Sequence, residues 1–316
     1  MTSETTLGPR RLDVAESYEA IFSAVCYRRG ERDVVHVVGP GALDYLQGQL
    51  SQDLLGLGIN DACSALLLSV QGKLDALVRV SRLGEDAYLI DVDEGFGEAV
   101  RARLARFKIR VKAELSEAET RPVLEVRGPE SSKVVPSDAL VALPPLLGRL
   151  RGVDLLARDG RAELDQSVPE GHDEAFEAAR IELGCPKMGR ELDATTIAFE
   201  AGIVAETISF TKGCYTGQEL IARLDARGAR VARHLRGVLF PPGEASLRPV
   251  AGDRLVRDGD EVGTLTSIAF SPRTKGLVAL AYLARRVEVP ATLGLSSATL
   301  GRLEGLSVVA LPLRSA

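Results

Sequence analysis

The pattern of apolar and polar residues in the first part of the chain predicts strands separated by helices. The segment DVVHVVGP (33–40) is rich in β-branched residues and ends in Gly-Pro, which predicts a strand followed by a break. In ALDYLQGQL (42–50) the leucines recur at helical spacing, so this segment is expected to be a helix. The runs SALLLSV and LDALVRV flank Gly72, which predicts a hairpin with its turn at that glycine.

The following segments continue this alternation. AYLIDVD (87–93) predicts a strand, GEAVRARLARF (97–107) an amphipathic helix, and KIRVKAEL (108–115) a half-buried strand. A short internal echo accompanies them, because VVHVVGPGA around Gly39 recurs as VLEVRGPES around Gly128. Repeated units of this kind predict an α+β architecture with two similar lobes.

The second half of the chain changes character twice. DEAFEAARIELG (173–184) predicts a helix, a long aperiodic connection covers residues 185–203, and a further helix is expected to end at Gly228. Beyond it, short β-prone runs alternate with Gly, Pro and Asp, which predicts a small β-barrel. We therefore expect two regions, 1–232 with the two α+β lobes and 233–316 with the barrel.

Composition excludes several classes of protein. The 316 residues are 45% hydrophobic with a net charge of −5, which is typical of a globular protein and argues against broad nucleic-acid binding. No apolar run is long enough to span a membrane, and residues 1–20 show no secretion signal, so we expect a cytoplasmic protein. The four cysteines are far apart without a CxxC pair, so no permanently bound metal is expected.

The octapeptide KGCYTGQE (212–219) is the strongest candidate for chemistry. Three features favour a thiolate at Cys214: the nearby cation Lys212, the start of a helix just downstream, and the small neighbours Gly213 and Gly217. The residues alone leave an alternative open, in which Cys214 is a small buried hydrophobe. The arginines that recur from Arg223 onward are equally consistent with a solvated helix face.

KGCYTGQE resembles the signature octapeptide of the YgfZ family, which contains folate-binding relatives of the glycine-cleavage T-protein, an aminomethyltransferase. LDYLQGQLSQDL, GVDLLA, ARIELGCPKMGRELDATTIAFEAG and VGTLTSIAFSPRTKGLVALAYL resemble further segments of that family, so the resemblance covers nearly the whole chain. It implies a three-lobed fold around a channel that holds tetrahydrofolate. The motif positions besides the lysine and cysteine are Gly213, Tyr215, Gly217, Gln218, Glu219 and Arg223.

The resemblance also assigns candidate cofactor-binding residues. Asp154 in GVDLL falls where the family's acid binds the pterin, whose edge offers paired N–H donors to a carboxylate. Arg180 is expected near the folate tail, where a guanidinium holds a glutamate carboxylate. Glu191, Asp193 and Glu200 line the channel in one interpretation and cap loop amides in the other.

One departure separates the chain from the T-protein itself. The T-protein carries an aspartate pair after the glycine turn of the hairpin, and the resemblance places this pair at Ala76 and Leu77. Asp75 is adjacent, but a shift of one residue in a strand directs a side chain to the opposite face. Loss of this acid together with the presence of Cys214 favours the YgfZ side of the resemblance.

The resemblance therefore implies an accessory role in iron–sulfur cluster assembly or repair, including support of tRNA-modifying enzymes. Cys214 would be a functional thiol beside the folate channel, acting as nucleophile, redox group or transient cluster ligand on iron–sulfur client or assembly proteins. Two alternatives stay open. One is a folate-dependent aminomethyl- or methyltransferase in which Asp75 or Glu191 replaces the missing acid, and the other is a noncatalytic module that docks acidic partners. Neither a membrane nor direct nucleic-acid binding is expected.

Overall fold

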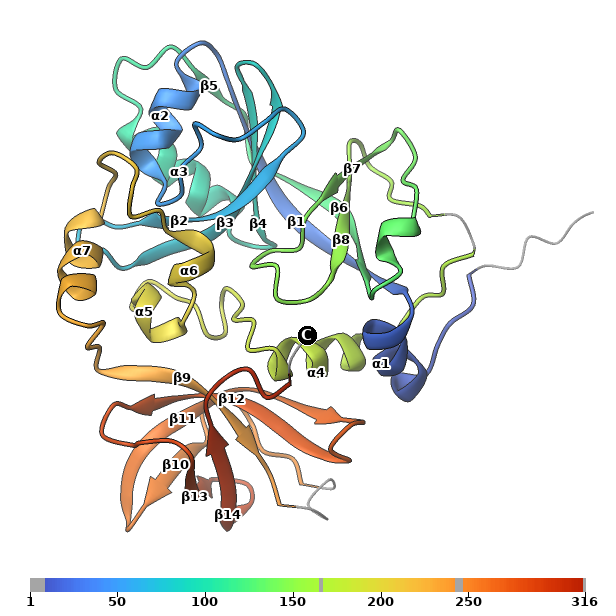
Figure 1. The fold of residues 1–316 in the computed structure, drawn as a ribbon, viewed down its shortest axis with the longest axis vertical. Helices are drawn as coiled ribbons and strands as arrows, with labels where there is room; N and C mark the ends of the chain where they lie inside the picture. The colour runs from blue at the N-terminus through green and yellow to red at the C-terminus, as the bar shows by residue number, and fades with distance from the viewer. Residues whose placement is uncertain (1–8, 165–166, 242–246, 315–316) are drawn as a thin grey trace, which may run out of the picture.

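The chain forms an antiparallel sheet in its first half and a closed barrel at its end, with helical segments between them (Figure 1). The computed structural model describes residues 9–164, 167–241 and 247–314. Residues 1–8 lie outside the described residues. They form part of the segment 1–20, in which the sequence predicts no secretion signal. The same is true of residues 242–246, which include part of the β-prone run GVLFPPG.

An eight-stranded sheet dominates the first half. Its path runs β2-β3-β4-β1-β6-β8-β7, and β5 pairs with the end of β1. The strands are β1 (Cys26–Val38), β2 (Ala62–Leu68), β3 (Leu74–Gly84), β4 (Ala87–Asp93), β5 (Glu114–Leu115), β6 (Glu119–Arg127), β7 (Leu140–Leu143) and β8 (Gly152–Ala157). The long strand β1 pairs with β6 through its first part and with β4 through its second, so it joins the two expected lobes in one sheet.

The Gly-Pro echo in the sequence corresponds to two similar turns. Gly39 after β1 and Gly128 after β6 have φ angles of 138° and 126°. A Cβ atom at Gly39 would lie 2.6 Å from the carbonyl oxygen of Lys112, and one at Gly128 would lie 2.2 Å from that of Ala24. Both positions therefore require glycine. Helix α2 (Ala42–Gln49) follows the first turn, and a short 3₁₀ turn, residues 131–133, follows the second.

The remaining helices pack on the sheet or connect it to the barrel. They are α1 (Val14–Ser23), α3 (Gly97–Phe107), α4 (Asp173–Glu182), α5 (Ala198–Ala201), α6 (Val204–Thr207) and α7 (Gln218–Ala226). Helices α2 and α3 cover the first part of the sheet, where Leu46 and Leu104 are fully buried in the main core. Helix α4 runs between sheet and barrel, and its buried Glu182 accepts hydrogen bonds from Tyr18 and Ser271.

The helices expected at 42–50, 97–107 and 173–184 are present, whereas the strand expected at 108–115 is largely absent. After α3 the chain turns at Arg110, which has a φ of 56°, and Ile109 is 75% exposed. This turn breaks the alternation that a half-buried strand requires. Two residues, those of β5, form the strand that the pattern predicted.

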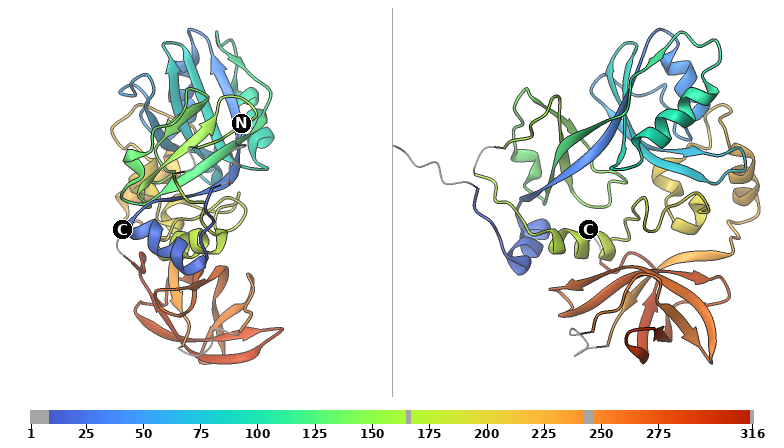
Figure 2. Two further views of the ribbon diagram at one scale, coloured as in Figure 1. Left: turned by 90° about the vertical axis from the view of Figure 1, so that its right-hand side faces the viewer. Right: turned by 180° about the vertical axis from the view of Figure 1, so that it is seen from behind.

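The C-terminal barrel begins at Arg233 and closes in the order β10-β11-β12-β9-β14-β13 (Figure 2). Its strands are β9 (Arg233–Leu239), β10 (Arg254–Arg257), β11 (Asp260–Ser271), β12 (Gly276–Ala284), β13 (Ala291–Ser297) and β14 (Gly301–Val309). Val238, Leu255 and Leu265 are among the residues that fill its interior. The predicted α+β fold class with a small terminal barrel is confirmed.

Candidate functional site

Charged side chains occupy alternate positions on the central strands of the sheet. Strand β6 contributes Glu125 and Arg127, which are two residues apart and therefore lie on one face. In the register of the sheet, Arg28 of β1 pairs with Glu125, and Glu125 pairs with Asp154 of β8. The sheet thus aligns a row of opposite charges across three neighbouring strands.

These side chains form a buried network of ion pairs. Arg79 is 1% exposed, and it donates to Asp91 at 2.9 Å and to Asp154 at 2.7 Å. Arg127 lies 2.7 Å from the other carboxylate oxygen of Asp154. Arg32 donates to Asp91 from the opposite side at 2.8 Å. Each buried charge therefore has an opposite charge within contact distance, which is the condition for placing charges in a protein interior.

The arginines keep the carboxylates of this network ionised. Burial raises the pKa of Asp154, but Arg127 and Arg79 outweigh it and hold that pKa below its ordinary value. The pKa of Glu125 is likewise lowered, because Arg28 and Arg127 more than offset its burial. At neutral pH both carboxylates are therefore acceptors of hydrogen bonds and not donors.

A cavity of about 110 Å³ lies between this charged face of the sheet and helix α4. Its lining includes two arginines, each with a buried N–H donor that has no hydrogen-bond partner among the described residues. These donors are Arg28 Nε and Arg32 Nη2, and the lining also includes Asp154, whose Oδ1 is ion-paired with Arg127 at 2.7 Å. Unpartnered buried donors are costly, so two of them beside one cavity indicate a polar ligand.

Arg180 also lines this cavity, but its guanidinium is fully used inside the protein. Its five N–H groups donate to both oxygens of Glu177, to Glu191, to the carbonyl of Cys185 and to Ser267. No N–H group is left for a folate carboxylate in this arrangement. In this structure Arg180 joins α4 to the barrel strand β11 through Ser267.

The other three candidate carboxylates do not line the central cavity. Glu191 is 1% exposed and accepts hydrogen bonds from Arg180 and Ser267. Asp193 caps the loop by accepting from Thr195, and Glu200 forms an ion pair with Arg233 at the start of the barrel. In this structure Asp193 caps its own loop, whereas Glu191 and Glu200 contact residues of the barrel.

Lys212 anchors the octapeptide to the C-terminal end of helix α2. Its Nζ donates to the carbonyl oxygens of Gln47, Leu50 and Gln52 at 2.6 to 2.8 Å. A cation is favoured there, since unpaired carbonyls and the helix dipole make this end negative. Burial lowers the pKa of Lys212 to about 8, while nearby Asp53 favours its charged form. The ammonium is therefore directed at backbone carbonyls and not at Cys214.

An alanine at position 212 is expected to lower the free energy of unfolding by about 2–4 kcal/mol, because it removes three hydrogen bonds from a charged donor. Urea denaturation followed by circular dichroism measures this loss. The matched control is Lys73→Ala, since Lys73 is exposed and its side chain contacts no described carboxylate or carbonyl. Equal effects of the two changes would contradict the anchoring role.

The rest of the octapeptide fixes the loop while leaving its thiol exposed. Tyr215 is 7% exposed and packs into the main core. A Cβ atom at Gly217 would lie 2.6 Å from the carbonyl oxygen of Ser69, so this glycine lies directly on the hairpin turn. Cys214, between these fixed points, is exposed. The alternative of a buried core cysteine is therefore excluded for Cys214.

The structure does not bring Cys214 and the central cavity together. The cavity is lined by residues from β1, β6, β8 and α4, whereas the thiol lies in the loop between α6 and α7, against α2 and the hairpin turn. Cys214 is therefore not among the residues that line this cavity. Sequence reasoning also missed the arginines at 28, 32, 79 and 127, whose signal was charge at alternate positions of otherwise apolar strands.

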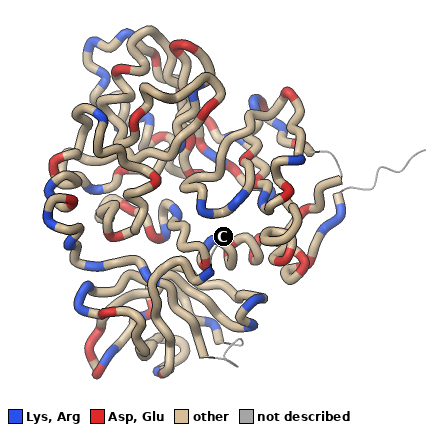
Figure 3. Tube along the Cα trace, in the orientation of Figure 1, with Lys and Arg blue, Asp and Glu red and all other residues tan. Residues whose placement is uncertain are grey.

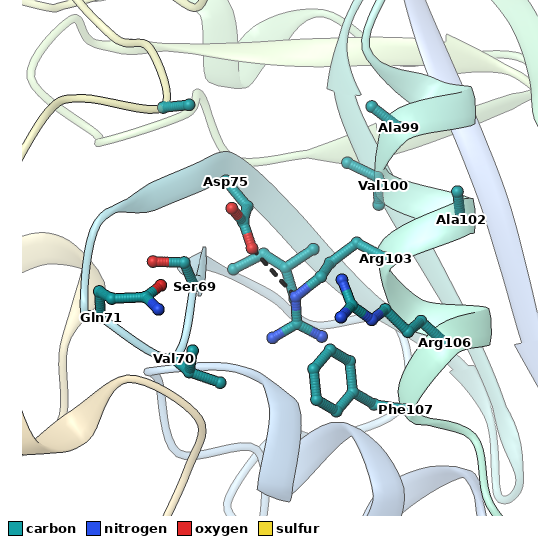
Figure 4. Close-up of a pocket in the computed structure, with 12 residues that line it drawn as sticks. Ser69, Val70, Gln71, Asp75, Ala99, Val100, Ala102, Arg103, Arg106 and Phe107 are labelled. Carbon is teal, nitrogen blue, oxygen red and sulfur yellow. Dashed lines mark hydrogen bonds and ion pairs between the residues drawn. The ribbon is translucent and has the colours of Figure 1, made fainter.

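Asp75 faces a second, larger cavity. Leu67 pairs with Ala76 and Leu68 with Leu74, so Asp75 is an extra residue at a β-bulge, and its carboxylate forms an ion pair with Arg103 of α3 at 3.0 Å (Figure 4). This cavity of about 520 Å³ shares no lining residue with the central one. Ala76 and Leu77 are fully buried. No carboxylate from residues 75–77 reaches the central cavity.

Within the described ranges, no group of three or more His, Cys, Asp or Glu side chains is arranged to hold a metal ion. No described helix has the length and apolar character that crossing a bilayer requires.

Comparison with known proteins places these features in context. Residues 233–312 match the family model of the glycine cleavage T-protein C-terminal barrel domain. The chain is 29% identical over 256 residues to the tRNA-modifying protein YgfZ of Edwardsiella ictaluri. This alignment covers 72% of this chain and 73% of that protein. It is also 28% identical over 332 residues to the aminomethyltransferase of Streptomyces avermitilis, in an alignment that covers 92% of this chain and 87% of that protein.

Two more similarities extend this comparison. The chain is 29% identical over 241 residues to the mitochondrial iron–sulfur cluster assembly factor IBA57 of Mus musculus, which covers 68% of this chain and 65% of that protein. Among solved structures, the glycine cleavage system aminomethyltransferase T from Bartonella henselae superposes with a TM-score of 0.77 at 19% identity, over 95% of this chain and 89% of that one. The structural match shows a common fold.

Proposed function

Since the chain belongs to the YgfZ family, related to the glycine-cleavage T-protein, we propose that it is a cytoplasmic, tetrahydrofolate-binding accessory protein in iron–sulfur cluster assembly or repair. The clusters would include those of tRNA-modifying enzymes, in line with the name of the YgfZ relatives. The central cavity would bind the folate, and Cys214 would act on the client. The observation that carries the folate part is the pair of unpartnered guanidinium donors, Arg28 Nε and Arg32 Nη2, on side chains that line one cavity together with the ionised carboxylate of Asp154.

The central cavity has the chemistry that a pterin requires. An amino-pyrimidinone ring offers N–H donors beside a carbonyl acceptor on one edge. The cavity would supply the complement, because the Asp154 carboxylate keeps acceptor lone pairs beside its ion pairs with Arg79 and Arg127, while Arg28 Nε and Arg32 Nη2 donate. Phe176 and Leu147 add apolar walls. Bound tetrahydrofolate would supply a one-carbon unit or reducing capacity.

The tail of the folate requires a different cation from the one expected. Arg180 has no free N–H group, whereas Lys187 is exposed, lines the same cavity, and has an ammonium without a described carboxylate partner. We assign the tail carboxylate to Lys187. An ammonium suits this position because it is a flexible point charge that reaches a mobile ligand group.

An aminomethyltransferase activity is less well supported than the accessory role. Asp75 is turned toward Arg103 by the bulge and does not line the central cavity, and Glu191 is held by Arg180 and Ser267. The carboxylates that do line it are Asp93, Glu125 and Asp154, and each is paired with arginine. None is free to serve as a proton acceptor of the kind that the transferase requires.

Deletion of the gene in its source organism tests the proposed function. We expect the activities of several unrelated iron–sulfur enzymes, including a tRNA-modifying one, to fall severalfold and to return with the wild-type gene on a plasmid. A dehydrogenase without a cluster serves as the control and should be unaffected. Normal iron–sulfur activities in the deletion strain would remove the accessory role.

A further inference from the structure

The second cavity opens at the surface between the β2–β3 turn and helix α3. Figure 4 shows Ser69 and Gln71 of the turn on one side and Arg103, Arg106 and Phe107 of the helix on the other. Its volume of about 520 Å³ and its separation from the central cavity mark it as an additional feature, which the proposed folate site does not use.

Two arginines line this cavity, and Arg106 is the one whose charge is not paired within the described part of the chain. Arg103 is engaged, since it donates to Asp75, to the side chain of Gln49 and to the carbonyl of Leu68. Arg106 is exposed and has no hydrogen bond or ion pair within the described part of the chain; its guanidinium lies 5.7 Å from the centroid of the Phe107 ring. An unpaired cation beside an apolar ring fits a carboxylate at the end of an apolar stem.

The same turn that walls this cavity also supports the octapeptide. A Cβ atom at Gly72 would lie 2.6 Å from Leu220 Cβ and 3.0 Å from the carbonyl oxygen of Gly217. The cavity and the Cys214 loop therefore lie on two sides of one turn. Val70 at the tip of this turn is 61% exposed, and Phe210, just before the octapeptide, is 49% exposed.

Helix α7 and its C-cap add two exposed arginines beyond the turn. Arg223 and Arg227 follow Leu220 by three and seven residues, so they lie on the side of the helix that continues from its contact with the turn. Both are exposed, and neither forms an ion pair with any described carboxylate. The helix also carries the exposed acids Glu219 and Asp225, and Figure 3 shows basic and acidic positions along it.

We infer that Arg106, Arg223 and Arg227, with the exposed Val70 between them, form a basic face that docks an acidic segment of a partner protein. A carboxylate of that segment enters the α3 cavity and pairs with Arg106, while further acids meet α7. The inference rests on the proposed function, and it deepens it by naming the chemistry of the client surface that is brought to Cys214.

The groups beside the arginines favour a protein over a nucleic acid at this face. Binding of single-stranded nucleic acid relies on open aromatic rings for stacking. The guanidinium of Arg103 lies 4.0 Å from the centroid of the Phe107 ring, so the ring face that it covers is closed to base stacking. Exposed Val70 instead supplies an apolar contact of the kind found among charged groups at protein interfaces.

Binding of a labelled acidic probe to the full-length protein tests the basic face. Fluorescence anisotropy is recorded with a fluorescein-labelled peptide of Glu-Glu-Leu repeats. We expect binding that weakens as salt is raised, and a loss of about tenfold in affinity for Arg106→Glu and for Arg223→Glu/Arg227→Glu, since reversal replaces attraction by repulsion. The control is Arg257→Glu, an exposed barrel arginine without a described ion-pair partner, which should change affinity less than twofold.

Two results overturn the docking inference: equal effects of Arg257→Glu and the face variants, or preferential binding of a single-stranded RNA of matched charge. Complementation of the deletion strain separates this failure from failure of the function. If Cys214→Ala lowers iron–sulfur enzyme activities while Arg106→Glu does not, the accessory role stands and the docking face is lost. If wild-type complementation itself has no effect, the proposed function fails.

Discussion

An Asp154→Ala variant is expected to lose tetrahydrofolate binding and about 3 kcal/mol of unfolding free energy. The change leaves Arg79 and Arg127 buried without one of their partners. Removing one member of a buried ion pair typically costs about 3–5 kcal/mol. We expect the lower end, because Arg79 keeps Asp91 and Arg127 keeps Glu125. Urea denaturation measures the stability, and calorimetric titration with tetrahydrofolate measures binding.

A variant that keeps the fold is needed to separate folate binding from stability. Arg32→Lys keeps a positive charge beside Asp91 and Asp93 but removes the unpartnered Nη2 donor from the cavity. We expect a stable protein that binds tetrahydrofolate about tenfold more weakly, the equivalent of one lost hydrogen bond. Tetrahydrofolate binding of wild-type strength by both Arg32→Lys and Asp154→Ala, or none by the wild type, would remove the pterin site.

Asp154 also predicts how stability responds to acid. The pKa of Asp154 in the folded protein is held below its ordinary value. The ion pairs of Asp154 therefore contribute their full share of the unfolding free energy above the pKa of the unfolded state, which is about 4. This share is lost as the pH falls through the pKa of the folded state. In Asp154→Asn this contribution is absent at every pH. The stability curves of wild type and variant should therefore converge below about pH 4. Curves that stay parallel down to acid unfolding would contradict the ionised pair.

The sequence predicts those parts of the fold that local pattern controls. Helix α3 and the β2–β3 hairpin follow from leucine and valine spacing and from the turn glycine at 72, and all of these signals lie within a dozen residues. The charged network does not follow in this way, because Arg79 and Asp154 are 75 residues apart and meet only through the order of strands in the sheet. Alternating charges in LIDVD and VLEVR indicate a charged sheet face, but not the partner of each residue.

The octapeptide is a second case in which the sequence identifies a residue but not its spatial neighbours. Its sequence identified Cys214, and the structure leaves that thiol exposed. What the sequence could not provide is the surroundings, since the carbonyls that hold Lys212 belong to residues 160 or more positions earlier. The lysine that suggested activation of the thiol instead anchors its loop on α2. Local charge patterns therefore identify a candidate residue more readily than they identify the groups around it.

A Cys214→Ala variant is expected to reduce iron–sulfur enzyme activities in cells to the level of the deletion strain. The thiol is exposed and held between the anchored Lys212 and the buried Tyr215, so it is presented to a partner and not to the protein's own core. For the same reason the change should alter the free energy of unfolding by less than about 0.5 kcal/mol. Activity and stability are thus expected to separate at this position.

The matched control for this variant is Cys63→Ala. Cys63 is partly buried at the start of β2, where burial raises the pKa of its thiol to about 11, so it is a poor nucleophile at neutral pH. Complementation of the deletion strain with each allele, at equal protein levels, measures the effect on several iron–sulfur enzymes. We expect Cys63→Ala to restore them and Cys214→Ala to fail. Full restoration by Cys214→Ala would show that the exposed thiol is dispensable and would leave the basic face as the functional part of this surface.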